Sequence, residues 1–179
     1  MLEFLVGAFS IEEFRKYYRT LLDLQAYYVR RTNRPSGPFD LGTDEREHIE
    51  RDSNHLIMWV NEGEIVGHCV WHETSTDEMV PGDPRDEDDS QYLKQLFGGK
   101  KDNLVELHEL WLKSEHRGKG FGQHFFSFFE DYISERGFDG IVHYTDHEAV
   151  VTLCRRRGYK EAFNESSGWF VFALTFSID

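Results

Sequence analysis

A glycine-rich run between a strand pattern and a helix pattern constrains the fold of this chain more than any other feature. The run is Arg117-Gly118-Lys119-Gly120-Phe121-Gly122. It follows an extended apolar stretch, residues 104–112, and precedes a segment with helical periodicity, residues 123–136. Glycine allows positive φ and close backbone approach, so several N–H groups can point at one anion, and the helix N-terminus adds roughly half a positive charge. The pattern therefore predicts a phosphate-binding turn.

The surrounding residues narrow the kind of turn. Neither the dinucleotide fingerprint Gly-x-Gly-x-x-Gly nor the P-loop pattern is present in the run. Instead, Arg-x-x-Gly-x-Gly follows Glu106-Leu107-His108-Glu109-Leu110-Trp111-Leu112 and precedes Leu153-Cys154-Arg155-Arg156-Arg157-Gly158-Tyr159. This ordered set covers roughly the C-terminal half and resembles the GCN5-related N-acetyltransferases (GNAT). Within that family the spermidine/spermine-type diamine acetyltransferases are most similar.

The resemblance implies that acetyl-CoA is the cosubstrate. Its pyrophosphate is expected on the turn, at Arg117, Gly118, Lys119, Gly120, Phe121, Gly122 and Gln123. Its thioester carbonyl is expected to meet a backbone N–H of Leu110, Trp111 or Leu112, where the family has a strand bulge. The last helix would add His147, which replaces the family's Asn, and Arg157. The run 155–157 could instead stabilise the C-terminus of its helix.

The general base is expected on the strand before the turn. The family pattern places an acidic pair on His108 and Glu109, so the first acid has become a histidine. Strand alternation puts Glu106 and His108 on one face and Glu109 on the other. Glu109 is the first candidate and His108 the second, since an imidazole near pKa 6.5 is a suitable base. A surface role without chemistry is the alternative for each.

The acid that protonates the leaving thiolate is less clearly marked, because Cys154 stands where the family usually has Tyr. A thiol and a phenol are both mainly protonated at pH 7. Cys154 is therefore a candidate proton donor. Since a thiol is shorter than a phenol, a water relay, another Tyr, a small buried residue without a chemical role, or no dedicated acid remain open.

The periodicities predict a mixed α/β (α+β) fold with a βαβ core, the GNAT fold, with about six to seven strands and about four helices. Strands are predicted at 56–60 and 65–71, joined by the hairpin signal Asn61-Glu62-Gly63-Glu64, and at 104–112, 141–144, 159–163 and 169–176. Helices are predicted at 120–136 and 147–157. The capping box Ser10-Ile11-Glu12-Glu13 begins a long first helix, and residues 44–51 favour a short second one.

Length and cysteine content indicate a single domain, residues 1–179, in a reducing compartment. The chain has two cysteines, without disulfide or metal spacing. Nine histidines are scattered, and His68, Cys69 and His72 would share a strand without a fourth ligand, so no metal site is expected. No run reaches the roughly 20 apolar residues of a membrane helix. We expect a cytoplasmic protein without a membrane partner, and a homodimer by analogy with relatives.

The net charge of the chain indicates which classes of partner it can bind. The formal net charge of −13 argues against nucleic acid, whose affinity comes mostly from Lys and Arg. Acid is concentrated within residues 74–101, an expected loop insertion in which residues 91–97 could form a helical turn. This acidic loop could attract a cationic acceptor, or it could be a solvated, partly disordered segment.

Together these features predict an acetyl-CoA-dependent N-acetyltransferase that acts on a primary amine by direct attack in a ternary complex. The expected acceptor is small and cationic: polyamine-like, aminoglycoside-like or an amino acid. Two alternatives stay open at this point. One is acetylation of protein N-termini or lysines; the other is a catalytically silent acyl-CoA-binding module, which the missing Tyr and Asn on the last helix would favour.

Overall fold

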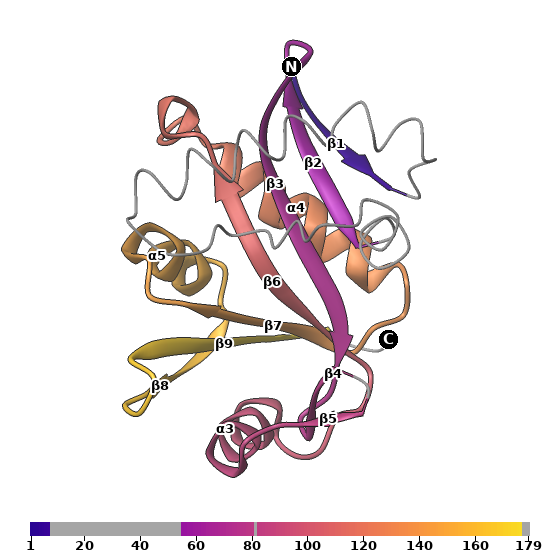
Figure 1. Cartoon of the computed structure of the whole chain (residues 1–179), viewed down its shortest axis with the longest axis vertical. Coiled ribbons are helices and arrows are strands. Elements are labelled where there is room, and N and C mark those ends of the chain that lie inside the picture. The colour runs from indigo at the N-terminus through magenta and orange to yellow at the C-terminus, as the bar shows by residue number, and fades with distance from the viewer. Residues whose placement is uncertain (8–54, 81, 177–179) are drawn as a thin grey trace, which may run out of the picture. The chain divides into compact units, whose positions relative to one another are not determined.

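Seven strands of the computed structural model form a mixed sheet in the order β1-β2-β3-β6-β7-β9-β8, and a further pair, β4 and β5, forms a small ribbon (Figure 1). The structure describes residues 1–7, 55–80 and 82–176. Both helices predicted before residue 54 lie outside these residues. The strands are β1 (Leu2–Val6), β2 (Leu56–Asn61), β3 (Glu64–Thr74), β4 (Glu78–Val80), β5 (Asp83–Pro84), β6 (Leu104–Leu112), β7 (Gly140–Thr145), β8 (Lys160–Asn164) and β9 (Trp169–Thr175).

The helices of the described residues are three α-helices and one 3-10 turn. They are α3 (Glu87–Phe97), α4 (Phe121–Ser134), α5 (Glu148–Arg156) and η1 (Ser114–His116). The mixed α/β fold class predicted from the sequence is confirmed, and most predicted elements agree with the observed ones to within a few residues. Within the described part of the chain, no helix is both long and apolar enough to cross a bilayer.

The chain divides into two compact units. The first, residues 1–70 with 109–117, contains β1 and β2 paired antiparallel, and β2 paired antiparallel with β3. The predicted hairpin joins β2 to β3, with positive φ at Glu62 and Gly63. Gly67 of β3 lies directly against β6: a Cβ there would be 2.5 Å from the Trp111 carbonyl oxygen. A side chain at residue 67 would therefore force these strands apart.

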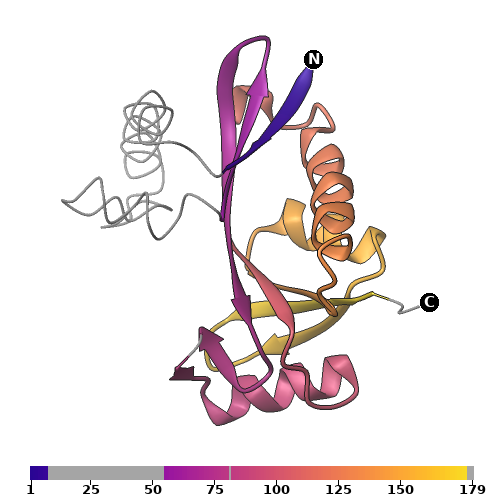
Figure 2. The ribbon, with the colours of Figure 1, turned by 90° about the vertical axis from the view of Figure 1, so that its right-hand side faces the viewer.

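The second unit, residues 71–108 with 118–179, contains the parallel pair of β6 and β7 that the βαβ pattern predicts. β9 runs antiparallel to β7 and to β8. The two faces of this sheet carry different helices, because neighbouring residues of a strand point to opposite sides. α3 lies on one side of the ribbon formed by β7 and β9, and α4 lies on the other (Figure 2). Val142 packs in the core beneath α3, whereas the next residue, His143, has its ring edge-on to Phe126 of α4.

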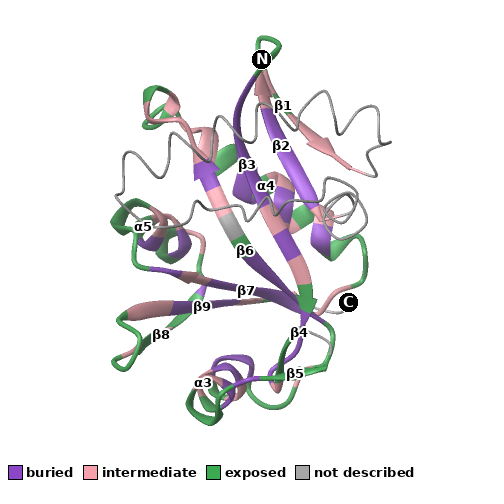
Figure 3. Cartoon of the chain, viewed as in Figure 1, coloured by how far each residue is buried: buried purple, intermediate pink, exposed green. Residues whose placement is uncertain are grey.

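The core of the second unit is apolar on both faces. Beneath α3 it consists of Leu93, Leu96, Phe97, Leu104, Val142, Val171 and Ala173. On α4 the face toward the sheet is largely aromatic, with Phe125, Phe126, Phe129 and Ile133 buried. β7 is accordingly buried at every residue except Tyr144, and this strand is largely purple in Figure 3. In β9 the buried residues are Val171, Phe172 and Ala173.

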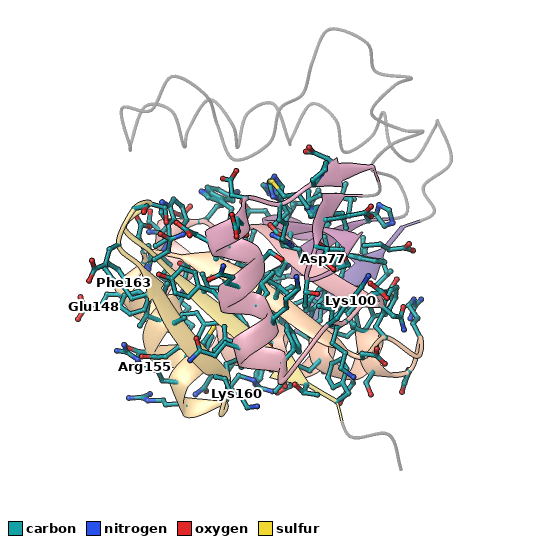
Figure 4. The ribbon with its side chains drawn as sticks, turned by 90° about the horizontal axis from the view of Figure 1, so that it is seen from below. Asp77, Lys100, Glu148, Arg155, Lys160 and Phe163 are labelled. Carbon is teal, nitrogen blue, oxygen red and sulfur yellow. The ribbon has the colours of Figure 1, made fainter. Side chains whose placement is uncertain are left out.

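Residues 74–101 hold more regular structure than the loop that the sequence predicts. They form the β4–β5 ribbon and α3, which begins at Glu87 rather than at residue 91. The Asp77 carboxylate forms ion pairs with Lys94 Nζ at 2.5 Å and with Lys100 Nζ at 3.4 Å. Figure 4 labels Asp77 and Lys100. The ion pairs lower the pKa of Asp77. Part of the predicted acidic loop is therefore tied to its own chain.

Candidate functional site

A buried charged cluster lies on the α3-facing side of the sheet in the second unit. Glu106 of β6 is its centre: it is two residues from the core residue Leu104, so strand alternation gives both the same face. His108 lies two residues further along that face, as the sequence predicts, and His72 of β3 joins them from the neighbouring strand. The cluster therefore combines two imidazoles with a buried carboxylate.

Arg85, which follows β5, holds this carboxylate in place. Its guanidinium is almost fully buried and donates one hydrogen bond to Glu106 Oε2 at 3.1 Å. Further hydrogen bonds go to Thr74 Oγ1, to the Ser75 carbonyl oxygen, to Asp89 Oδ2 and to the Tyr144 hydroxyl, at 2.6 to 2.9 Å. A buried cation with so many fixed partners is a strong positional anchor. It leaves Oε1 as the atom of Glu106 that faces the histidines.

Glu106 stays ionised despite its burial. Burial raises the pKa of its carboxyl group, but the nearby His108, Arg85 and His72 outweigh that effect, and the pKa lies below the ordinary glutamate value. Its Oε1 is 3.7 Å from His108 Nδ1 and 3.9 Å from His72 Nε2. The carboxylate is thus a fixed negative charge next to both imidazoles.

Asp89 and Tyr144 complete the cluster on its α3 side. The Tyr144 hydroxyl donates a hydrogen bond to Asp89 Oδ2 at 2.7 Å. Burial, together with the Asp89 carboxylate, raises the pKa of Tyr144 well above its ordinary value, although the Arg85 charge opposes this. Tyr144 is therefore a neutral hydrogen-bond donor, not a phenolate. The two carboxylates Glu106 and Asp89 exceed the single guanidinium by one charge, which favours a further cation nearby.

The glycine turn at the start of α4 has the backbone that the sequence predicts for an anion site. Gly118 and Gly120 have φ of +74° and +81°, a region that side chains other than glycine rarely adopt. Gly120 is the N-cap, so no side chain is available there to accept the first N–H groups, and the first turn has no acidic residue. Helix-start amides of this kind form a site for phosphate oxygens.

The strand end before the turn belongs to the first unit. The Lys113 N–H donates to the Val66 carbonyl oxygen, and Arg117 Nε donates to the Leu112 carbonyl oxygen at 3.0 Å. Trp111 is buried and its ring lies 6.1 Å from that of His68. Glu109 is part of β6, but its side chain lies outside the described atoms. The roles predicted for Leu110, Trp111, Leu112 and Glu109 stay predictions.

On α5 the predicted residues take different positions. His147 is the N-cap, and Thr145 Oγ1 accepts a hydrogen bond from its N–H, so the helix begins close to the predicted residue 147. Arg157 is ion-paired with Glu130 of α4 and also donates to Ser127 Oγ at 3.2 Å. Its expected contact with the cofactor would compete with this pair. The role stays a prediction.

Cys154 is fully buried on α5. Burial and the Glu130 charge raise the pKa of its thiol to about 12, although the Arg157 charge lowers it. Nearby Tyr159, which the sequence pattern placed only as the end of the motif, donates to Glu130 Oε1 at 3.0 Å. A thiol with a raised pKa is a weaker acid, although it remains protonated at neutral pH. The proton-donor role of Cys154 stays a prediction.

Comparison with known proteins decides the family. The model of the acetyltransferase (GNAT) family matches residues 15–159. The chain belongs to the GNAT family. A curated relative, Probable N-acetyltransferase 14 of Xenopus tropicalis, is 34% identical over 86 residues; the match covers 47% of this chain and 40% of that protein.

Solved structures show the same fold as this GNAT chain at low identity. A GNAT-family acetyltransferase from Listeria monocytogenes has a TM-score of 0.63 and 16% identity, covering 97% of this chain and 95% of the other. A polyamine N-acetyltransferase from Drosophila melanogaster has a TM-score of 0.61 and 14% identity, covering 97% and 100%. At these identities the likeness concerns the fold alone.

Sequence reasoning missed the residues that hold Glu106 in place. Arg85 and Asp89 were counted only within an acidic loop, and Tyr144 only as part of a strand. The i,i+4 spacing of Arg85 and Asp89 is the one sequence signal for this cluster, because residues four apart can form an ion pair across one helical turn, and these two do. The contact between Arg85 and Glu106 joins residues 21 positions apart and has no local pattern.

Proposed function

We propose that this GNAT protein transfers the acetyl group of acetyl-CoA to the nitrogen of a small, cationic primary amine. The observation that carries the proposal is the glycine turn before α4, in a chain whose family membership is shown. The N–H groups of residues 118–123 would bind the pyrophosphate. Arg117 and Lys119 add positive charge to the same short stretch of sequence.

The charge of the cluster supports a cationic acceptor. Glu106 and Asp89 exceed Arg85 by one negative charge, and the side chain of His108, beside Glu106, is 53% exposed. An ammonium group would be attracted by this imbalance and would reach the cluster from the solvent side of His108. The fold is compatible with such an acceptor, since the Drosophila protein of the same fold is named a polyamine N-acetyltransferase.

The first chemical step is the removal of a proton from the ammonium group of the acceptor. An alkyl ammonium with a pKa near 10.4 must lose its proton before attack, which costs roughly 4 to 5 kcal/mol at pH 7. His108 would accept that proton; its contact with the fixed Glu106 carboxylate, which would stabilise the imidazolium that forms, supports this role. Glu109 remains the other candidate base. The amine nitrogen then bonds to the thioester carbon, the carbon–sulfur bond breaks, and the thiolate of CoA takes up a proton.

The test is the release of CoA thiol from acetyl-CoA in the presence of an amine panel. The panel contains spermidine, an aminoglycoside, free amino acids, and a peptide with a free N-terminus and a lysine. Both cysteines of the protein are fully buried, so the thiol reagent should report CoA with little background. We expect turnover with at least one small cationic amine.

Two results would change the proposal. Turnover with the peptide alone would assign acetylation of protein N-termini or lysines instead. Tight binding of CoA without turnover on any amine would favour a silent acyl-CoA-binding module. A cytoplasmic location and a homodimer stay predictions.

A further inference from the structure

We propose that His72, Glu106 and His108 form a binding site for a transition-metal ion of the Zn²⁺ type. The three side chains come from two neighbouring strands of the second unit, β3 and β6. One ligand atom from each lies within 4.8 Å of the other two. Two imidazole nitrogens and one carboxylate oxygen are a donor set that suits Zn²⁺ and related ions, and a fourth position would hold water.

The distances are close to those that a metal requires. With bonds of about 2.0 to 2.1 Å in a tetrahedral site, neighbouring ligand atoms lie about 3.4 Å apart. Glu106 Oε1 lies 3.7 Å from His108 Nδ1 and 3.9 Å from His72 Nε2. Binding would therefore draw each imidazole toward the carboxylate by about half an ångström or less. The two imidazole nitrogens lie within 4.8 Å of each other and would also have to approach, and their rings are already neighbours, with centroids 5.3 Å apart.

The atoms behind the ligands are arranged as they are around known metal sites. Arg85 binds Oε2 of Glu106 and leaves Oε1 for the ion. His72 Nδ1 is 3.4 Å from the Glu73 carbonyl oxygen, and donation of a proton there leaves the lone pair on Nε2, toward Glu106. A histidine ligand that donates its other N–H to a carbonyl is held in the tautomer and orientation that metal binding needs.

Charge and access also favour an ion at this place. The excess of one carboxylate over the guanidinium gives the cluster a net negative charge, which attracts a cation. The side-chain exposures rise from 8% for Glu106 to 21% for His72 and 53% for His108, so the carboxylate lies at the base and an imidazole at the solvent. An ion can thus enter from the His108 side. The ion would take the His108 lone pair and the negative charge that the proposed function assigns to the amine, so bound Zn²⁺ would inhibit acetyl transfer. Titration with Zn²⁺ in the absence of acetyl-CoA and amine tests the site separately from that function.

The experiment titrates the purified, metal-stripped chain with Zn²⁺ alone in a calorimeter. We expect one Zn²⁺ per chain, a raised melting temperature with Zn²⁺, and no comparable binding of Mg²⁺, which prefers oxygen ligands. His72→Gln and His108→Gln should each weaken Zn²⁺ binding about tenfold or more. His124→Gln is the matched control, because His124 is an exposed histidine of α4 outside the cluster, and its affinity should equal that of the wild type.

Three results would overturn the site. They are the absence of Zn²⁺ binding by the wild type up to about 1 mM, unchanged affinity in either cluster variant, and an equal loss in His124→Gln. Circular dichroism checks the fold of every variant. Should His72→Gln fail to fold, His108→Gln carries the test, since this exposed side chain can change with little effect on packing.

Discussion

Replacing Gly120 by alanine separates anion binding from folding. Gly120 has a φ of +81°, and a Cβ built on it meets no other atom within 4 Å. The protein itself therefore has room for the methyl group, and the cost to folding is only the strain of a side chain in the left-handed region, about 1 to 2 kcal/mol. In the proposed complex, the added methyl group would obstruct the approach of the pyrophosphate oxygens to the backbone N–H groups of residues 118–123.

The chain offers a matched control in Gly137, which follows α4. Its φ is +78°, and a Cβ there also meets no atom within 4 Å. Gly137→Ala should thus cost the same 1 to 2 kcal/mol of unfolding free energy, as estimated for strain alone. Because Gly137 lies outside residues 118–123, the Gly137→Ala variant should bind CoA with the affinity of the wild type.

The expected loss of CoA affinity follows from the hydrogen bonds at stake. One charge-assisted hydrogen bond between an amide and a phosphate oxygen contributes roughly 1.5 to 3 kcal/mol, which is about 10- to 150-fold in Kd. Calorimetry with CoA measures the affinity, and urea unfolding measures the stability. Equal CoA affinity in Gly120→Ala and Gly137→Ala would refute the assignment of the turn.

Three further predictions concern the cluster and α5. His108→Gln should lower kcat/KM for the amine about 100-fold or more if His108 is the base, whereas His124→Gln should not; equal rates in thiol-release assays would remove His108 from the mechanism. The lowered pKa of Glu106 gives stability that is complete above the unfolded-state value of about 4.3 and is lost as the pH falls through the lower folded-state pKa. Glu106→Gln should therefore flatten the acid side of the pH–stability curve from urea unfolding, and an unchanged curve would contradict this account. Because Cys154 is buried and its pKa is raised to about 12, Cys154→Ala should retain most of kcat; a loss of about 100-fold or more would instead establish the thiol as proton donor.

Much of the second unit could be predicted from the sequence because its signals are local. The strand 104–112 was predicted with the bounds that β6 has. The glycines of the turn and the helical periodicity of α4 follow rules of backbone conformation and side-chain spacing that act within a few residues. The same-face placement of Glu106 and His108 follows from strand alternation alone and agrees with the observed cluster.

What the sequence did not indicate depends on contacts between distant residues. Arg85 lies in an acidic segment whose composition favours a solvated loop, yet the structure buries its guanidinium among groups from β3, α3, β6 and β7. The sequence likewise predicts that Arg157 binds the phosphates of the cofactor, but in the structure Arg157 pairs with Glu130, 27 positions away in the sequence. Such pairings are set by the packing of helices on the sheet, which composition and periodicity do not encode.

The proposed acetyl-CoA site is tested most directly by a crystal structure of the chain with CoA bound. The account predicts pyrophosphate oxygens within hydrogen-bond distance of backbone N–H groups in residues 118–123, at the start of α4. A pyrophosphate bound elsewhere on the chain, with these amides free of the ligand, would contradict it.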